Sequence, residues 1–80
     1  MYFVYIVQCS DDTYYTGITT DVERRVQEHN SSDKGAKYTK LRRPVRLVYQ
    51  ESSSDRSTAS KREYEIKKYT RLKKIELINS

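Results

Sequence analysis

Two side chains suited to acting on an anion share one arc of a predicted helix in the first half of the chain. Arg25 and His29 fall within roughly 100° of two valines, because helical positions advance about 100° per residue. Arginine binds anions through a fork of donors, and histidine exchanges a proton near neutral pH. The same spacing also fits an arginine that covers the core edge with its methylenes and a hydrogen-bonded boundary histidine.

A second helical segment places a carboxylate among its inward positions. Glu63 shares an arc of about 60° with Ala59 and Ile66. Burying an ionised glutamate costs free energy unless the carboxylate is paired or binds a cation. Its partner is therefore either a neighbouring Lys or Arg, which this chain offers in number, or a metal ion.

Three tyrosines and a glycine lie in two short apolar runs near the N-terminus. Tyr5, Tyr14 and Tyr15 are good strand residues, and most strand tyrosines only pack on the pleated surface. Gly17 gives up packing inside its run, which marks a bulge or a close approach of backbone or ligand.

The first half of the chain is expected to form a hairpin and a helix that position these side chains. Residues 2–9 and 14–18 have strand composition and are separated by a polar turn. Thr20 and Glu23 match a capping box, so the helix should begin near residue 21 and end near residue 30.

The second half is expected to form a strand and two helices. Residues 45–50 alternate as in a strand. Asp55 or Ser54 can cap a helix that runs to about residue 69, and Thr70 can cap a short helix through residue 78. The order β-β-α-β-α-α predicts an α/β (α+β) fold, a three-stranded sheet with helices against it. Residues 1–80 should form one domain, since so short a chain has no room for a second core.

Charge favours an anionic partner. The net charge is +5, and residues 31–80 hold fourteen Lys or Arg against six acids, whereas residues 1–30 hold two against five. Nucleic acid is the commonest partner of such a basic domain, although many basic surfaces only keep a protein soluble.

The segment 31–43 is expected to be a basic loop, since it contains Gly35 and ends before Pro44. It either tracks a nucleic-acid backbone and stacks on an exposed base, or is a solvated surface loop. Its candidate contact residues are Lys34, Lys37, Tyr38, Lys40, Arg42 and Arg43.

The single cysteine, Cys9, excludes an intramolecular disulfide and a cysteine-rich zinc site. The apolar run 2–9 is too short to span a membrane and lacks the features of a signal peptide. We expect a cytoplasmic protein without a membrane partner.

Taken in order, these residues resemble the GIY-YIG nuclease superfamily. The order is Phe3-Val4-Tyr5, Tyr15-Thr16-Gly17, Arg25 and His29 on the next helix, and Glu63 on a later one. Residues 15–21, 24–25, 28–30, 35–39, 43–45 and 61–63 look especially like the small stand-alone bacterial members. The likeness covers nearly the whole chain.

The resemblance implies a three-stranded antiparallel sheet flanked by helices and a metal-dependent endonuclease that hydrolyses phosphodiester bonds with little sequence specificity. DNA is a better expectation than RNA, and a protein partner would direct the enzyme to its target. The family's site residues carry over as follows: Tyr5 and Tyr15 match the motif tyrosines, Gly17 the motif glycine, Arg25 the phosphate-contacting arginine, His29 a position beside the scissile phosphate, and Glu63 the sole carboxylate for Mg²⁺ or Mn²⁺.

Two departures from the family pattern keep other functions open. Phe3 replaces the first motif glycine, and Asn79 is the candidate for an asparagine that follows the glutamate in several active members. The alternatives are a non-catalytic nucleic-acid-binding module that retains the fold, and a basic module that binds another protein. For the enzyme, we expect the five catalytic candidates to converge on one face of the sheet, with Tyr5 or Tyr15, helped by His29, receiving the proton of the attacking water.

Overall fold

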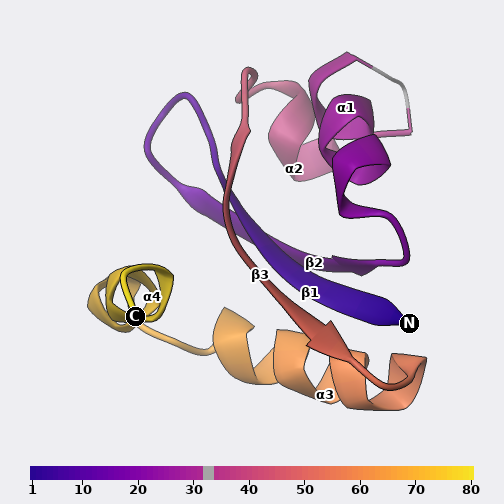
Figure 1. Cartoon of the computed structure of the whole chain (residues 1–80). Coiled ribbons are helices and arrows are strands. Elements are labelled where there is room, and N and C mark those ends of the chain that lie inside the picture. The colour runs from indigo at the N-terminus through magenta and orange to yellow at the C-terminus, as the bar shows by residue number, and fades with distance from the viewer. Residues whose placement is uncertain (32–33) are drawn as a thin grey trace.

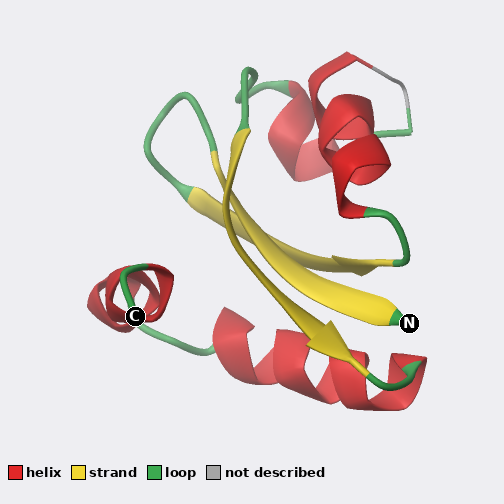
Figure 2. Ribbon diagram, viewed as in Figure 1, coloured by secondary structure: helices red, strands yellow, loops and turns green. Residues whose placement is uncertain are grey.

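A three-stranded antiparallel sheet lies between two layers of helices. The computed structural model describes residues 1–31 and 34–80, with strands β1 (Tyr2–Gln8), β2 (Tyr14–Thr19) and β3 (Arg46–Ser53) and helices α1 (Val22–Ser31), α2 (Lys37–Lys40), α3 (Arg56–Lys67) and α4 (Arg71–Ile78). The strand order is β2-β1-β3, so β1 is central (Figure 1). Helices α1 and α2 lie on one side of the strands, and α3 and α4 lie on the other (Figure 2). The predicted fold class and element order are confirmed, with the short α2 as an addition.

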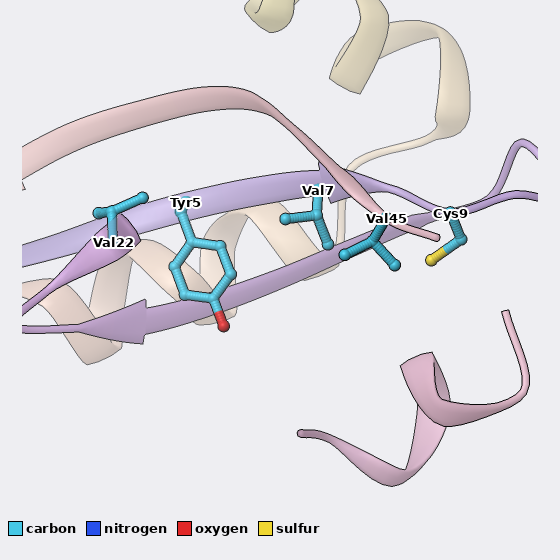
Figure 3. Packing of buried hydrophobic residues seen from close by; sticks show 5 residues of the cluster. All are labelled: Tyr5, Val7, Cys9, Val22 and Val45. Atoms are coloured by element: carbon cyan, nitrogen blue, oxygen red, sulfur yellow. The ribbon is translucent and has the colours of Figure 1, made fainter. Parts of the chain in front are cut away.

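The central strand is covered on both faces, which explains its uninterrupted apolar sequence. Val4, Tyr5, Ile6 and Val7 are each at most 1% exposed. Because side chains alternate along a strand, Tyr5 and Val7 face α1 while the other two face α3. Figure 3 shows Tyr5 beside Val22, the first residue of α1, and Val7 beside Val45.

Each face therefore has its own core. The α1 side is built from Tyr5, Val7, Cys9, Val22 and Val45 (Figure 3). The α3 side is built from Val4, Ile6, Ala59 and Ile66, with residues of α4 packed against them. The sheet therefore separates the side chains of the two helical layers, except at its margins.

The later helix caps are confirmed, and the first is corrected. Asp55 Oδ1 accepts a hydrogen bond from the Thr58 amide at 2.8 Å, and Thr70 Oγ1 accepts one from the Lys73 amide at 3.2 Å. At α1 the predicted capping box on Thr20 is wrong, because Asp21 Oδ1 accepts from the amide three residues later at 3.1 Å. The carboxylate takes the capping role, so α1 begins at Val22.

Two segments differ from the sequence prediction for reasons of tertiary packing. Strand β3 extends to Ser53 instead of Gln50, because Ser52 and Ser53 pair with the first residues of β1. The predicted basic loop contains a helical turn at Lys37–Lys40, while its positions 32 and 33 lie outside the described residues. Within the described chain, no helix is long and apolar enough to cross a membrane.

Candidate active site

Gly17 gives the Tyr5 ring its place in the site. The two residues are paired in the β1–β2 ladder, and both lie on the α1 face. A Cβ at Gly17 would lie 2.6 Å from Tyr5 Oη, closer than atoms can approach. The sequence predicted a bulge or a close approach at Gly17. The structure shows a close approach, in which the Tyr5 ring packs against the glycine backbone.

Tyr5 and His29 meet inside the protein. Tyr5 Oη lies 2.7 Å from His29 Nε2, and the His29 side chain is fully buried. Burial, followed by the nearby charge of Arg25, lowers the pKa of His29 to about 4. The imidazole is neutral at pH 7, and its environment opposes the cationic form.

The Tyr5 phenol is held in its neutral form. Burial raises the pKa of Tyr5 to about 12, although a hydrogen bond from Arg25 and its positive charge act in the lowering direction. A phenolate is therefore scarce at neutral pH without a further cation. Arg25 and any metal ion near the hydroxyl would both favour loss of its proton.

Helix α1 and the segment after it hold Arg25 beside that hydroxyl. Arg25 Nη1 donates to the Lys34 carbonyl oxygen at 2.7 Å and to Glu28 Oε1 at 3.0 Å. The residue is half-buried, and its guanidinium lies within hydrogen-bonding reach of the Tyr5 side chain. Such a guanidinium is suited to binding a phosphate that enters from the surface.

Tyr15 forms the outer wall of the site. Its ring meets the His29 ring edge-on at 5.2 Å between centres and stacks with the Tyr38 ring at 6.0 Å. Tyr38 is 39% exposed, so this row of rings leads from the buried histidine to the surface.

Glu63 reaches the same region from the opposite layer of the molecule. Its Oε2 lies 3.2 Å from Lys67 Nζ, which in turn lies 6.0 Å from the centre of the Tyr15 ring. The negative charge of Glu63 also acts on the Tyr5 hydroxyl, as one of several smaller contributions to its raised pKa. The expectation that all five residues converge on one face is corrected: four lie on the α1 face, and Glu63 comes around the β2 edge from α3.

The amino-acid sequence matches the model of a known protein family over most of the chain. Residues 1–76 match the family model for the GIY-YIG catalytic domain. The chain belongs to the GIY-YIG family.

Relatives of this GIY-YIG protein are small bacterial proteins. It is 61% identical to a UPF0213 protein of Desulfotalea psychrophila over 99% of this chain and 72% of that protein, and 62% identical to a UPF0213 protein of Staphylococcus aureus over 96% and 93%. Its fold is similar to the solution structure of a UPF0213 protein of Bacillus halodurans, with a TM-score of 0.62, 46% identity, and 99% of this chain and 84% of that chain covered.

The side chains of this GIY-YIG domain that could bind a metal would suit an ion that needs few protein ligands. Across residues 1–31 and 34–80, no group of three or more His, Cys, Asp or Glu side chains could hold a metal. A lone carboxylate such as Glu63 does not suit zinc, but it suits Mg²⁺ or Mn²⁺, whose shell is completed by water and phosphate oxygens. Asn79 ends α4 and borders a groove with Tyr14 and Ile75, and Glu63 does not line that groove.

The six residues predicted to contact nucleic acid divide into two groups. Lys34, Lys37 and Lys40 are exposed, as is Tyr38. Arg42 pairs with Asp11 at 3.0 Å and lies 4.0 Å from the centre of the Tyr38 ring, and Arg43 donates to the His29 carbonyl oxygen. Lys37 and Lys40 on α2 are thus open to solvent, while both arginines are bonded to other parts of the protein.

Two residues of the site were missed by the sequence analysis. Thr39 contacts His29 Nδ1 at 2.9 Å, and Lys67 pairs with Glu63. Lys67 follows Glu63 at the i,i+4 spacing of helical ion pairs, so its contact was available from the sequence. Thr39 gave no such signal, because its contact depends on α2 folding back onto α1.

Proposed function

We propose that this protein is a metal-dependent endonuclease that hydrolyses phosphodiester bonds in DNA with little sequence specificity. The observation that carries the proposal is a buried Tyr5–His29 pair on whose hydroxyl the charges of both Arg25 and Glu63 act. This set supplies an anion-binding cation, a metal ligand and a proton acceptor, which are the groups that phosphodiester hydrolysis requires. The family relationship supports the same reaction.

Glu63 would hold one Mg²⁺ or Mn²⁺ at the edge of the site. When bound, such an ion neutralises charge on the phosphoryl oxygens and stabilises the leaving oxygen. Lys67 pairs with Oε2 of Glu63, so its ammonium would compete with an ion for that oxygen. Once displaced, this ammonium can bind a phosphate oxygen, while Arg25 binds the non-bridging oxygens of the scissile group.

Tyr5 and His29 would manage the proton of the attacking water. Tyr5 Oη receives this proton while its own proton passes to His29 Nε2, 2.7 Å away. The transfer needs no free phenolate, which the Tyr5 pKa of about 12 makes scarce. It does require that His29 Nε2 carry a lone pair. It also makes the imidazole cationic, a form that its pKa of about 4 opposes and that the negative charge of a bound phosphate would favour.

The exposed lysines and Tyr38 would hold the DNA strand that leads to the site. Lys37 and Lys40 are exposed on α2, beside the Tyr38 ring that stacks with Tyr15. Contacts to the phosphate backbone position a strand without reading its bases, which supports low sequence specificity. DNA in the cytoplasm, reached with the help of a protein partner, is the substrate we propose.

The test is incubation with branched, nicked and single-stranded DNA in Mg²⁺ or Mn²⁺, followed by the same reactions with a chelator. We expect cutting that the chelator abolishes, and matched RNA substrates should be cut more slowly. Tight binding without cutting on any substrate would reject the endonuclease and favour the non-catalytic nucleic-acid-binding module.

A further inference from the structure

Both nitrogens of the His29 ring have partners inside the protein. Nε2 lies 2.7 Å from Tyr5 Oη, and Nδ1 lies 2.9 Å from Thr39 Oγ1. The His29 and Thr39 side chains are both fully buried. A neutral imidazole has one donor nitrogen and one acceptor nitrogen, so the directions of these two hydrogen bonds are linked.

The single hydroxyl proton of Thr39 decides between the two directions. Thr39 Oγ1 donates to the Ala36 carbonyl oxygen at 2.9 Å. A carbonyl oxygen only accepts, so the proton is engaged there and Oγ1 can only accept from the histidine. Nδ1 must then carry the ring proton, and Nε2 is left as the acceptor.

A competing arrangement is built into the same segment. The Ala36 amide donates a long hydrogen bond to His29 Nδ1 at 3.4 Å, which needs this nitrogen as an acceptor and is weaker than the 2.9 Å contact with Thr39. If Thr39 did not accept, Nδ1 could accept from this amide, and the ring proton would move to Nε2. Tyr5 would then receive a hydrogen bond from His29 instead of donating one.

We infer that Thr39 is a positioning residue that holds His29 in the Nδ1-protonated tautomer and so keeps the Nε2 lone pair open to the Tyr5 proton. The catalytic meaning of this inference rests on the proposed function, whereas the tautomer itself does not. Helix α2 supplies the geometry, because its turn aims the Thr39 hydroxyl at both the Ala36 carbonyl and the ring.

The tautomer can be read directly by ¹⁵N NMR of the imidazole in the free protein. The chain has one histidine, so the ring signals need no assignment. At pH 7 we expect the proton on Nδ1 in the wild type and in Thr39→Ser, which keeps the hydroxyl. Thr39→Val keeps the shape of the side chain but removes the hydroxyl acceptor, so in this variant the ring proton of His29 should move to Nε2. A wild-type proton on Nε2, or an unchanged tautomer in a folded Thr39→Val, would overturn the inference.

Cleavage kinetics test the positioning role separately. Thr39→Val should lower kcat by about 100-fold, which is the size of a lost proton-transfer contribution, with little change in KM. Thr39→Ser keeps the hydroxyl and should keep a kcat close to that of the wild type. A shifted tautomer with unchanged kcat would overturn the positioning role. If the wild type cuts no DNA, the proposed function fails, and the NMR result still decides the tautomer.

Discussion

At the scale of single residues, the surroundings of Glu63 decide what its substitution should do. Its side chain is 23% exposed, and that of its partner Lys67 is 50% exposed. Because water reaches the ammonium, the i,i+4 pair contributes only about 0.3–0.5 kcal/mol, and its loss should change stability little. Removing one partner of a fully buried ion pair would cost about 3 kcal/mol or more of stability, and we expect no such loss at Glu63.

We therefore predict that Glu63→Gln folds with a melting temperature close to that of the wild type, binds DNA at least as well, and has no cleavage activity. Mg²⁺ should raise the melting temperature of the wild type in the presence of uncut DNA analogue but not that of the variant, because the ligand is gone. Glu65→Gln is the matched control, since Glu65 lies on the same helix and pairs with Arg62. Equal Mg²⁺ stabilisation of wild type and Glu63→Gln would remove Glu63 as a metal ligand.

His29 should make stability depend on pH in a defined window. Its folded pKa of about 4 lies below its ordinary value of 6.5, so the unfolded chain binds the proton more readily between these values. Stability is then fully present above pH 6.5 and falls as the pH decreases toward 4, by about 3 kcal/mol at most. Denaturant melts across this range measure the fall.

The pH dependence of stability that comes from carboxylates with lowered pKa values lies at lower pH than that from His29. The pKa values of Asp11 and Asp55 lie below 3.8, held there first by hydrogen bonds from Thr13 and Thr58, so their contributions are lost only as the pH falls below that value. His29→Gln should flatten the profile between pH 6.5 and 4. A wild-type profile as flat as the variant's would contradict the assignment.

Gly17→Ala is predicted to displace the Tyr5 ring and break its contact with His29. The new methyl would lie 2.6 Å from Tyr5 Oη, and overpacking of this kind costs about 1–3 kcal/mol. In a Tyr5→Leu background the same substitution should cost much less, because the ring is gone. Urea denaturation of the wild type, the two single variants and the double variant measures the coupling free energy between Gly17 and Tyr5. Losses of stability that simply add would show that the glycine serves another purpose.

At the scale of elements, the short helix α2 organises both the interior and the surface of the site. Its Thr39 is buried against His29, while its two lysines are exposed. The segment that follows is tied down by Arg42, which bonds the Tyr38 carbonyl oxygen at 2.8 Å and pairs with Asp11. Lys37 and Lys40, not Arg42, are therefore the residues with which to test backbone contacts.

We predict that Lys37→Ala with Lys40→Ala flattens the salt dependence of DNA binding. If each lysine neutralises one phosphate, the slope of log affinity against log salt should fall in magnitude by about two units. Arg56→Ala with Lys61→Ala removes the same charge from the exposed start of α3 and is the matched control. Titrations at several salt concentrations measure the slopes, and an equal change in both pairs would assign α2 to solvent.

At the scale of the whole molecule, Lys67 of α3 reaches Tyr15 of the outer strand β2, whose ring packs in the core on the α1 side. Tyr5, Tyr15 and the α1 residues belong to one core, and α3 packs against the other. Glu63 joins the tyrosines only because β2 is the outer strand and Lys67 lies across its edge. Displacing α3 along the sheet would therefore separate the carboxylate from the residues that hold the phosphate.

The sequence by itself determined the order of the elements, the fold class, two of three helix caps and the family. These depend on local periodicity, on capping residues such as Asp55 and Thr70, and on the order of a few motif residues. It also named the residues that gather at the site, whose catalytic roles stay predictions, as does the single domain.

Only the tertiary structure decided how these residues are connected. The full length of β3 depends on pairing with β1, and the direction from which Glu63 arrives depends on sheet order. The Thr39 contact with His29 depends on α2 folding back over α1, and the ion pair of Arg42 with Asp11 depends on the turn between β1 and β2 lying beside the segment after α2. Each joins residues ten or more positions apart, and no local pattern specifies such contacts, because they form only when separate elements pack together.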